Sequence, residues 1–150
     1  MKGYLDNEEA TKNTIKDGGW LHSGDIGYYD EHGRFFIVDR LKELIKVKGY
    51  QVAPAELEDL LRNHPKVEDV AVIGIPHDRL GQVPRAYIVQ KASANCSVEE
   101  ILAFVALEAA EYKQLVGGVE FIDKIPKSAA GKILRRELRD LYDIEHQNKK

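Results

Sequence analysis

The sequence predicts an α+β fold in which a mostly antiparallel sheet is flanked by helices. After residue 53, apolar patterns of helix and strand type follow one another in the order helix, strand, strand, helix, strand. The 150 residues are 43% hydrophobic and 31% charged, which is typical of a folded globular chain. A chain of this length can bury one core, or a small domain together with part of another.

The first 38 residues predict only one helix and one hairpin. Asn7 can cap the helix, and Glu8 and Glu9 lie in its first turn, where the helix dipole favours acids. Two such elements carry too little apolar surface to form a domain alone. The expected elements are a helix from Asn7 through Ile15 that Gly18-Gly19 ends, and strands Ile26–Tyr29 and Arg34–Val38 joined by the turn Asp30–Gly33.

The remaining residues predict the sheet and its helices. Pro54 is suited to the first turn of a helix, and Ser97 with Glu100 forms a capping box at the start of another. The expected strands are Glu43–Val47, Tyr50–Val52, Val67–Ile75, Arg85–Gln90 and Val119–Ile125. Three helices are expected in this part of the chain. The first begins at Pro54, the second runs from Ser97 toward Leu115 and is closed by Gly117-Gly118, and the third covers Ile133–Leu141.

Composition and charge argue against several classes of function. The 22 basic and 25 acidic side chains give a net charge of -3, which does not indicate a nucleic-acid partner. One cysteine, Cys96, and five dispersed histidines do not predict a metal site. No apolar run approaches 18 residues, so we expect no membrane span and a soluble protein of a reducing compartment.

The turn from Pro126 to Lys132 carries the best indication of function. Gly131 lets the backbone turn without a Cβ clash, so the Lys132 ammonium can project toward an anion. The run departs twice from the phosphate-binding pattern G-x-x-x-x-G-K-[ST], because Pro126 replaces the first glycine and Ile133 the hydroxyl. On these residues alone, a surface turn that caps the next helix is the favoured alternative, and the rest of the chain reverses that preference.

Four separated blocks carry a resemblance to a known family. They are His22–Asp25, Phe36–Lys46, Lys48–Glu58 and Pro126–Leu138. In this order and spacing they resemble the adenylate-forming (AMP-binding) superfamily, in the branch of coumarate:CoA ligases, other acyl-CoA synthetases and beetle luciferases. The resemblance runs from Gly3 nearly to Leu141.

Members of that family use ATP to convert a carboxylate into an acyl-adenylate and then pass the acyl group to coenzyme A. The resemblance implies that residues 1–38 are the tail of the large N-terminal domain, residues 39–40 the hinge, and residues 41–150 the small mobile domain. It implies ATP and coenzyme A as cofactors, with Mg²⁺ held mainly by the large domain. The partners would be a carboxylic acid and that missing domain, without which full activity is not expected.

The resemblance also assigns two catalytic lysines. Lys132 resembles the lysine that enters the closed site during adenylation, where an ammonium can bind the carboxylate and the α-phosphate together. Lys46 resembles a second lysine, presented on the opposite face for the thioester-forming or oxidative half-reaction. By its pattern alone, Lys46 would be the polar side of an alternating strand.

Binding roles follow from the same blocks. Asp25 resembles the acid that holds the ribose hydroxyls of ATP, and Arg40 an arginine that contacts ribose or phosphate. Without the resemblance, Asp25 would be a turn residue and Arg40 a surface ion-pair partner. The other matches are Asp39 as the hinge, Gly49 and Tyr50 in the turn that lines the pantetheine tunnel, and Gln51 near the reacting centre.

Two departures and two alternatives accompany this interpretation. Ala129-Ala130 stands where relatives often place a hydroxyl, so a hydrogen bond that orders the loop would be lost. Asn148–Lys150 is not a Ser-Lys-Leu-type signal, and we expect a cytoplasmic or peroxisomal location. The alternatives are a luciferase-type monooxygenase and a stand-alone, non-catalytic module that binds through the basic segment 124–139.

Overall fold

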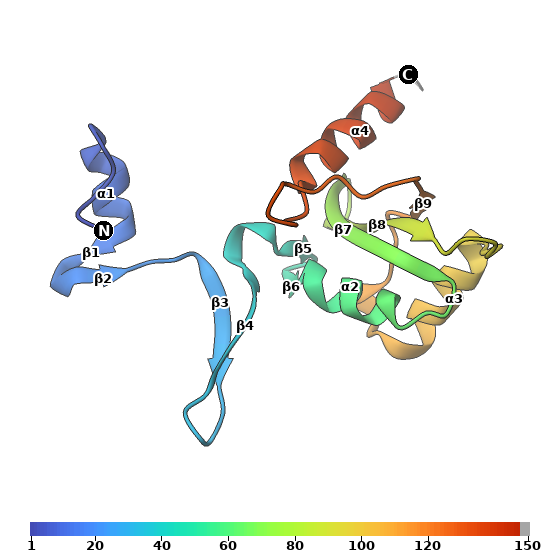
Figure 1. The fold of residues 1–150 in the computed structure, drawn as a ribbon, viewed down its shortest axis with the longest axis horizontal. Helices are drawn as coiled ribbons and strands as arrows, with labels where there is room; N and C mark the ends of the chain where they lie inside the picture. The colour runs from blue at the N-terminus through green and yellow to red at the C-terminus, as the bar shows by residue number, and fades with distance from the viewer. Residues whose placement is uncertain (148–150) are drawn as a thin grey trace. The chain divides into compact units, whose positions relative to one another are not determined.

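The computed structural model describes residues 1–147 and divides the chain between Lys42 and Glu43 into two compact units. We call Met1–Lys42 the N-terminal unit and the part from Glu43 onward the C-terminal unit (Figure 1). The final residues 148–150, on which the expectation about a Ser-Lys-Leu-type signal rests, lie outside the described residues. Among residues 1–147, no helix combines the length and apolarity that a bilayer crossing requires.

The N-terminal unit begins with the expected capped helix. In α1 (Glu8–Thr14), the Asn7 side chain accepts a hydrogen bond from the Ala10 N–H at 2.9 Å. The helix ends at Thr14, so the expectation that it runs through Ile15 and is ended by the glycine pair is wrong; Gly18 and Gly19, both with φ near 80°, instead turn the chain back on itself. Two short strands that the sequence did not predict, β1 (Ile15–Lys16) and β2 (Trp20–Leu21), pair across this turn.

The expected hairpin is formed by β3 (Asp25–Tyr29) and β4 (Phe35–Arg40). Asp30 orders its turn, since one carboxylate oxygen accepts from the N–H groups of His32 and Arg34 at 2.9 and 3.0 Å. β4 extends two residues beyond the predicted strand, so Asp39 and Arg40 are strand residues paired with Ile26 and Asp25. A 3₁₀ turn over Leu41–Glu43 follows.

The C-terminal unit contains the predicted, mostly antiparallel sheet. Its strand order is β6 (Tyr50–Val52), β5 (Ile45–Val47), β8 (Gly81–Gln90) and β7 (Val67–His77), all antiparallel. A fifth strand, β9 (Val119–Phe121), pairs with β8 in parallel. The long β7–β8 ladder is the main structural element of the unit, because it supplies most of the buried residues on which the helices pack.

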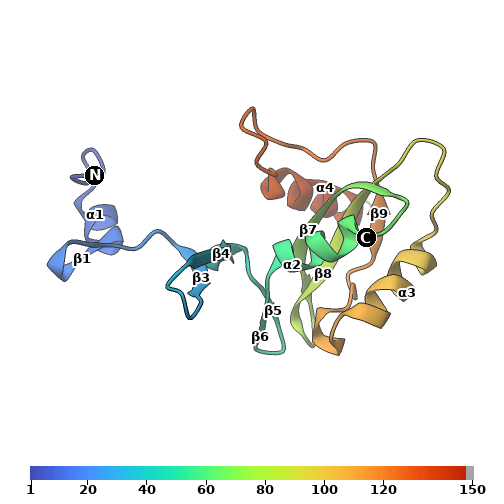
Figure 2. The same cartoon turned by 60° about the horizontal axis from the view of Figure 1, so that its bottom comes forward.

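Helices cover both faces of this sheet (Figures 1 and 2). On one face, α2 (Pro54–Arg62) and α3 (Val98–Glu108) pack against side chains of β7 that include Val70 and Val72. The intervening residues Ala71 and Ile73 point to the other face, where α4 (Arg135–Gln147) packs through Leu138. The alternation of side chains along β7 therefore builds two core clusters, one on each face.

Several element boundaries differ from the prediction. β7 and β8 continue through Pro76 and Pro84, which lie beyond the predicted strands Val67–Ile75 and Arg85–Gln90. α3 ends at Glu108, and the Gln114 side chain donates to the Ala109 carbonyl at 2.8 Å, which satisfies an acceptor at the helix end. The predicted continuation toward Leu115 is a 3₁₀ turn, Glu111–Lys113. β9 stops at Phe121, before the predicted end at Ile125. α4 begins at Arg135, two residues later than expected, and continues beyond the predicted end at Leu141 to Gln147.

Candidate functional site

Lys132 lies in a closed loop between β9 and α4. The Ser128 N–H donates to the Lys132 carbonyl at 2.8 Å, and the Leu134 N–H donates to the Pro126 carbonyl at 2.9 Å. Gly131 has φ +77°, and the space where a Cβ would stand is open among the described residues. The loop thus ends in an exposed lysine on a backbone conformation that glycine readily adopts.

Ser128 is a loop residue whose part the sequence reasoning missed. Its hydroxyl oxygen accepts a hydrogen bond from the Lys132 N–H at 3.2 Å. A hydroxyl is therefore supplied from four residues before the lysine, although Ala129-Ala130 lacks one. The loop thus has one ordering hydroxyl contact of its own, while a hydrogen bond from the position of Ala129-Ala130 stays an expected loss. A serine at the first position inside a tight turn often forms such a side-chain-to-backbone hydrogen bond, so the sequence did contain an indication of this contact.

Lys46 occupies the centre of β5 and faces away from the core. Its neighbours Ile45 and Val47 are 1% and 4% exposed, so alternation along the strand turns the lysine outward. Gln51 on β6 is its direct cross-strand partner, and both side chains are exposed. The structure therefore places Lys46 beside Gln51, which the resemblance matched to a residue near the reacting centre.

The turn between β5 and β6 has the residues that a tight hairpin needs. Lys48 and Gly49 both have positive φ, 48° and 86°, and the Lys48 N–H donates to the Leu80 carbonyl at 2.9 Å. Tyr50 stacks on Tyr112, with ring centroids 4.4 Å apart. A half-open groove of about 400 Å³ adjoins this pair, lined by Val47, Lys48, Tyr50, Leu80, Glu111, Tyr112, Gln114 and Val116.

Asp25 and Arg40 form a pair within the N-terminal unit. They are cross-strand partners at the open end of the β3–β4 hairpin, and Arg40 Nε lies 3.3 Å from Asp25 Oδ1. The Ser23 hydroxyl accepts from the Asp25 N–H at 3.2 Å, and the Asp39 carboxylate accepts from the Arg40 N–H at 2.7 Å. The acid and the guanidinium are partly exposed, so both can exchange their contact for a ligand.

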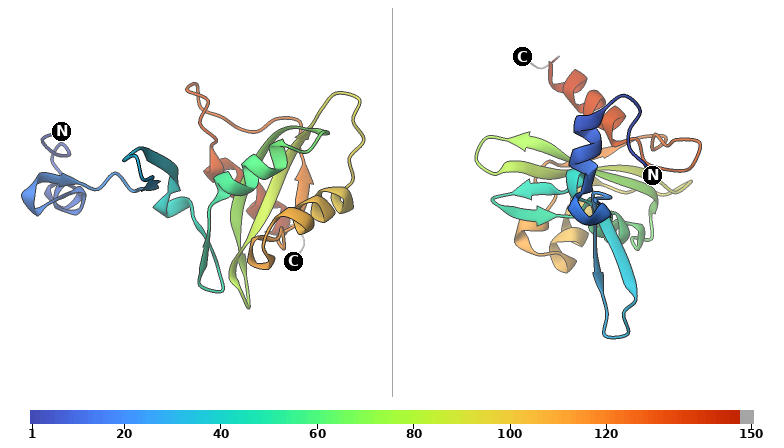
Figure 3. Two further views of the ribbon diagram at one scale, coloured as in Figure 1. Left: turned by 90° about the horizontal axis from the view of Figure 1, so that it is seen from below. Right: turned by 90° about the vertical axis from the view of Figure 1, so that its left-hand side faces the viewer.

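The two lysine-bearing segments lie on different sides of the C-terminal unit. In Figures 2 and 3, the turn between β5 and β6 and the loop between β9 and α4 project in opposite directions from the sheet. Both segments join the β7–β8 ladder, since β5 pairs with β8 and Lys127 contacts Asp69 of β7. The structure therefore does not bring Lys46 and Lys132 into one cluster.

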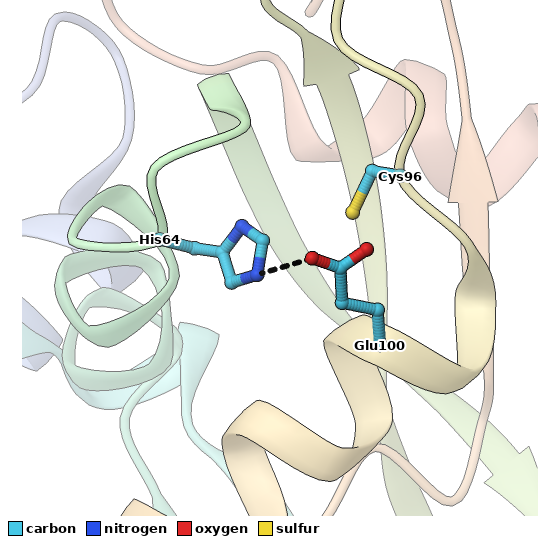
Figure 4. A group of neighbouring side chains, drawn as sticks. All are labelled: His64, Cys96 and Glu100. Carbon is cyan, nitrogen blue, oxygen red and sulfur yellow. Dashed lines mark ion pairs between the residues drawn. The ribbon is translucent and has the colours of Figure 1, made fainter.

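One group of side chains has the atoms of a metal site but not its arrangement (Figure 4). A nitrogen of His64, the sulfur of Cys96 and a carboxylate oxygen of Glu100 lie within 4.8 Å of one another. However, His64 Nδ1 accepts the Lys66 N–H at 3.3 Å, which favours the tautomer whose proton is on Nε2 and points toward Glu100.

Neighbouring charges make the same group unsuited to a cation. The Lys66 ammonium already lies 2.7 Å from Glu100, and that contact lowers the pKa of the Glu100 carboxyl. Burial, with a further contribution from Glu100, raises the pKa of the Cys96 thiol, so the thiolate form that metals bind is disfavoured. These residues fit a polar cluster that joins α3 to the segment after α2.

Comparison with known proteins gives a consistent set of relatives. A family model described as the AMP-binding enzyme C-terminal domain matches residues 56–132. The 4-coumarate--CoA ligase-like 1 protein of Arabidopsis thaliana is 56% identical over 140 residues, which are 93% of this chain and 26% of that protein. Luciferin 4-monooxygenase of Nipponoluciola cruciata is 51% identical over 141 residues, 94% of this chain and 26% of that protein.

Solved structures agree with these sequence relatives. The crystal structure of ATP-bound MatB from Rhodopseudomonas palustris matches with a TM-score of 0.89 at 33% identity, over 94% of this chain and 28% of that one. The chain thus spans about a quarter of the length of the relatives that it matches.

Proposed function

Because the chain belongs to the AMP-binding enzyme C-terminal domain family, we propose that it is the C-terminal portion of an ATP-dependent carboxylate:CoA ligase. The family model and the relatives confirm the resemblance that the four sequence blocks suggested. The proposed reaction has two steps, acyl-adenylate formation with release of pyrophosphate and then transfer of the acyl group to coenzyme A. The rest of the enzyme would carry the acyl pocket and hold most of the Mg²⁺-ATP.

The observation that carries the proposal is that two exposed lysines belong to segments that project in opposite directions from one sheet. A lysine at the end of a glycine turn can approach the α-phosphate and carboxylate, and it offsets the negative charge that develops as pyrophosphate leaves. Lys46 would serve the thioester-forming step, with Gln51 beside it. The groove next to Tyr50 would accept part of the coenzyme A arm.

The Asp25–Arg40 pair suits the nucleotide. A carboxylate can accept hydrogen bonds from both ribose hydroxyls, and a guanidinium can pair with ribose or phosphate oxygens. In this structure the two side chains form an ion pair with each other, with Arg40 Nε 3.3 Å from Asp25 Oδ1. We propose that ATP replaces this contact, and that Asp39, the residue before Arg40, lies at the hinge between residues 1–38 and 41–150.

The N-terminal unit supports the proposal of a missing large domain. Within residues 1–42, all of which the structure describes, no apolar side chain is buried. Trp20, Tyr29 and Phe35 are 76%, 72% and 79% exposed, and Ile37 is 69% exposed. Apolar surface of this density calls for a covering partner. The segment that precedes this chain in relatives about four times as long is the proposed occupant.

A luciferase-type monooxygenase is the second candidate. The 51% identity to a luciferin 4-monooxygenase supports it, because the adenylation step would use the same C-terminal residues. Light emission that requires oxygen and luciferin in the whole protein would favour this function over coenzyme A transfer. For either candidate, we propose a cytoplasmic or peroxisomal location.

Separate assays of the two half-reactions test the proposal in the whole protein that contains this chain. Lys132→Ala should slow adenylate formation about 100- to 1,000-fold, because a preorganised cation is removed from the developing charge, and should spare thioester formation from added acyl-adenylate. Lys46→Ala should have the reverse pattern.

Lys124→Ala is the matched control for these variants. Lys124 is an exposed lysine in the same connection between β9 and α4, and its removal should leave both half-reactions at the wild-type rate. Equal losses of both half-reactions in either site variant would contradict the assignment of one lysine to each step.

A further inference from the structure

The loop that carries Lys132 is attached to β7 at both ends. On the incoming side, Lys127 Nζ lies 2.6 Å from the Asp69 carboxylate. On the outgoing side, Arg135 Nε donates to the Val72 carbonyl at 3.2 Å. Asp69 and Val72 both belong to β7, so this strand at the edge of the sheet is the common support for the loop.

Glu58 completes the outgoing attachment from α2. Its Oε1 accepts a hydrogen bond from Arg135 Nη2 at 2.7 Å and another from the Val72 N–H at 2.9 Å. The Glu58 side chain is 4% exposed and that of Arg135 is 13% exposed. One buried oxygen thus joins a helix, a strand and the first residue of α4, which is the kind of satisfied contact that a buried charge requires.

The two attachments differ in strength. The Lys127 and Asp69 side chains are 36% and 27% exposed, so water competes with that pair. The pair of Glu58 and Arg135 is shielded, and its removal leaves a guanidinium without its carboxylate. The position of the loop therefore depends more on the contact made by Glu58 than on the contact made by Asp69.

We propose that Glu58 is a positioning residue for Lys132, and that it acts through Arg135. Arg135 follows Lys132 by three residues, so a displacement of the start of α4 moves the base of the lysine directly. The loop's own hydrogen bonds hold its local shape, but no described residue beyond its chain neighbours lies within 4 Å of the position of a Gly131 Cβ, so the placement of the loop depends on the attachments at its base. The inference rests on the proposed role of Lys132 in adenylate formation, and it extends that site to a buried residue 74 positions earlier in the chain.

The test compares Glu58→Gln with Asp59→Asn in the whole protein. Both changes remove one carboxylate from α2, but the Asp59 side chain is 77% exposed and pairs with Arg62. Glutamine keeps the length and an oxygen for the Val72 N–H, and it loses the charge that holds Arg135 at 2.7 Å and, more distantly, Arg62 at 3.9 Å. Adenylate formation should fall about 10- to 100-fold in Glu58→Gln, because a lysine displaced by about 1 Å is poorly placed for reaction. Thioester formation from added acyl-adenylate should stay at the wild-type rate, and Asp59→Asn should match wild type in both steps.

A second measurement does not depend on activity. Amide hydrogen exchange of Gly131 and Leu134 should become about tenfold faster in Glu58→Gln, because the loop opens locally, while amides of β8 keep their wild-type exchange. Equal losses in both half-reactions, or unchanged exchange in the loop, would overturn the positioning role. If Lys132→Ala leaves adenylation intact while loop exchange responds to Glu58→Gln, the attachment stands and the proposed function of Lys132 is the part that fails.

Discussion

Glu58 shows how a single buried side chain can link stability to pH. Burial raises its pKa above the ordinary 4.5, although Arg135, the Val72 N–H and Arg62 act in the opposite direction. A carboxyl whose pKa is raised on folding contributes stability that is fully present below its unfolded pKa. That contribution is lost as the pH rises through the folded pKa. The Glu58 carboxyl that is proposed to hold the loop thus lowers the free energy of unfolding when it becomes charged.

This sign gives a prediction for Glu58→Gln, in which the titrating group is removed. As the pH rises from about pH 4, near the unfolded pKa of a glutamate, through the raised folded pKa of Glu58, the free energy of unfolding of the wild type should fall relative to that of the variant, because only the wild type must bury a newly formed charge. Urea unfolding of both proteins across this range measures the difference. Asp59→Asn controls for the loss of one charge on α2, and a wild-type advantage that grows with pH would show that Arg135 outweighs burial.

At the scale of elements, the connection from α3 to β9 depends on two adjacent glycines. The Gly117 N–H donates to the Pro84 carbonyl at 2.9 Å, and the Gly118 carbonyl accepts from the Ala86 N–H at 3.1 Å. The sequence suggested that this pair closes a helix, but α3 ends at Glu108, well before it. The glycines instead bring the chain close enough to β8 for β9 to begin its parallel pairing.

The two glycines should differ in their response to alanine. A Cβ on Gly117 would stand 2.7 Å from the Pro84 carbonyl oxygen and 2.9 Å from Ile75 Cδ1, so we expect Gly117→Ala to destabilise the fold by about 2 to 3 kcal/mol. Gly118 has φ +84°, and a Cβ there would meet Arg85 Nη1 at 3.6 Å, an ordinary contact, so Gly118→Ala should cost about 1 kcal/mol from backbone strain. Denaturant midpoints of the two variants test the order, and an equal loss would contradict the steric explanation.

At the scale of the whole molecule, the two units differ in the interactions that stabilise each of them internally. The buried apolar side chains all lie between Ile45 and Leu138 within the described residues, whereas the N-terminal unit relies on hairpin and helix hydrogen bonds. Aromatic pairs on the hairpin surface, such as Tyr28 with Phe36 at 5.0 Å, remain largely solvent-exposed. Independent stability is therefore expected of the C-terminal unit alone.

Hydrogen exchange on the 150-residue chain tests this difference. Amides of Phe35–Val38 should exchange far faster than those of Val70–Ile73, because the hairpin has no buried apolar face that must open first. Protection of the two segments to a similar degree would contradict the view that the N-terminal unit needs a covering domain. Joining the large domain of the proposed enzyme should restore protection to the hairpin.

Local patterns predicted most of the elements, and long-range contacts explain what they missed. Asn7 and Ser97 cap helices as their spacing indicated, and the alternation around Lys46 placed that lysine outside the core. The parallel pairing of β9 depends on a chain crossover that strand propensity does not encode. The contact of Glu58 with Arg135 joins residues 77 positions apart, so no window of sequence contains it.

The two lysine-bearing segments project in opposite directions from one sheet, and this would make the steps of the proposed reaction mutually exclusive. In the proposed enzyme, a single body carries both groups, so turning one toward the substrate turns the other away. The geometry of the unit would then set the order of adenylation and thioester formation, without any coupling between the two lysines. An intermediate could not meet the second lysine until the first had been withdrawn, which protects the adenylate from premature transfer.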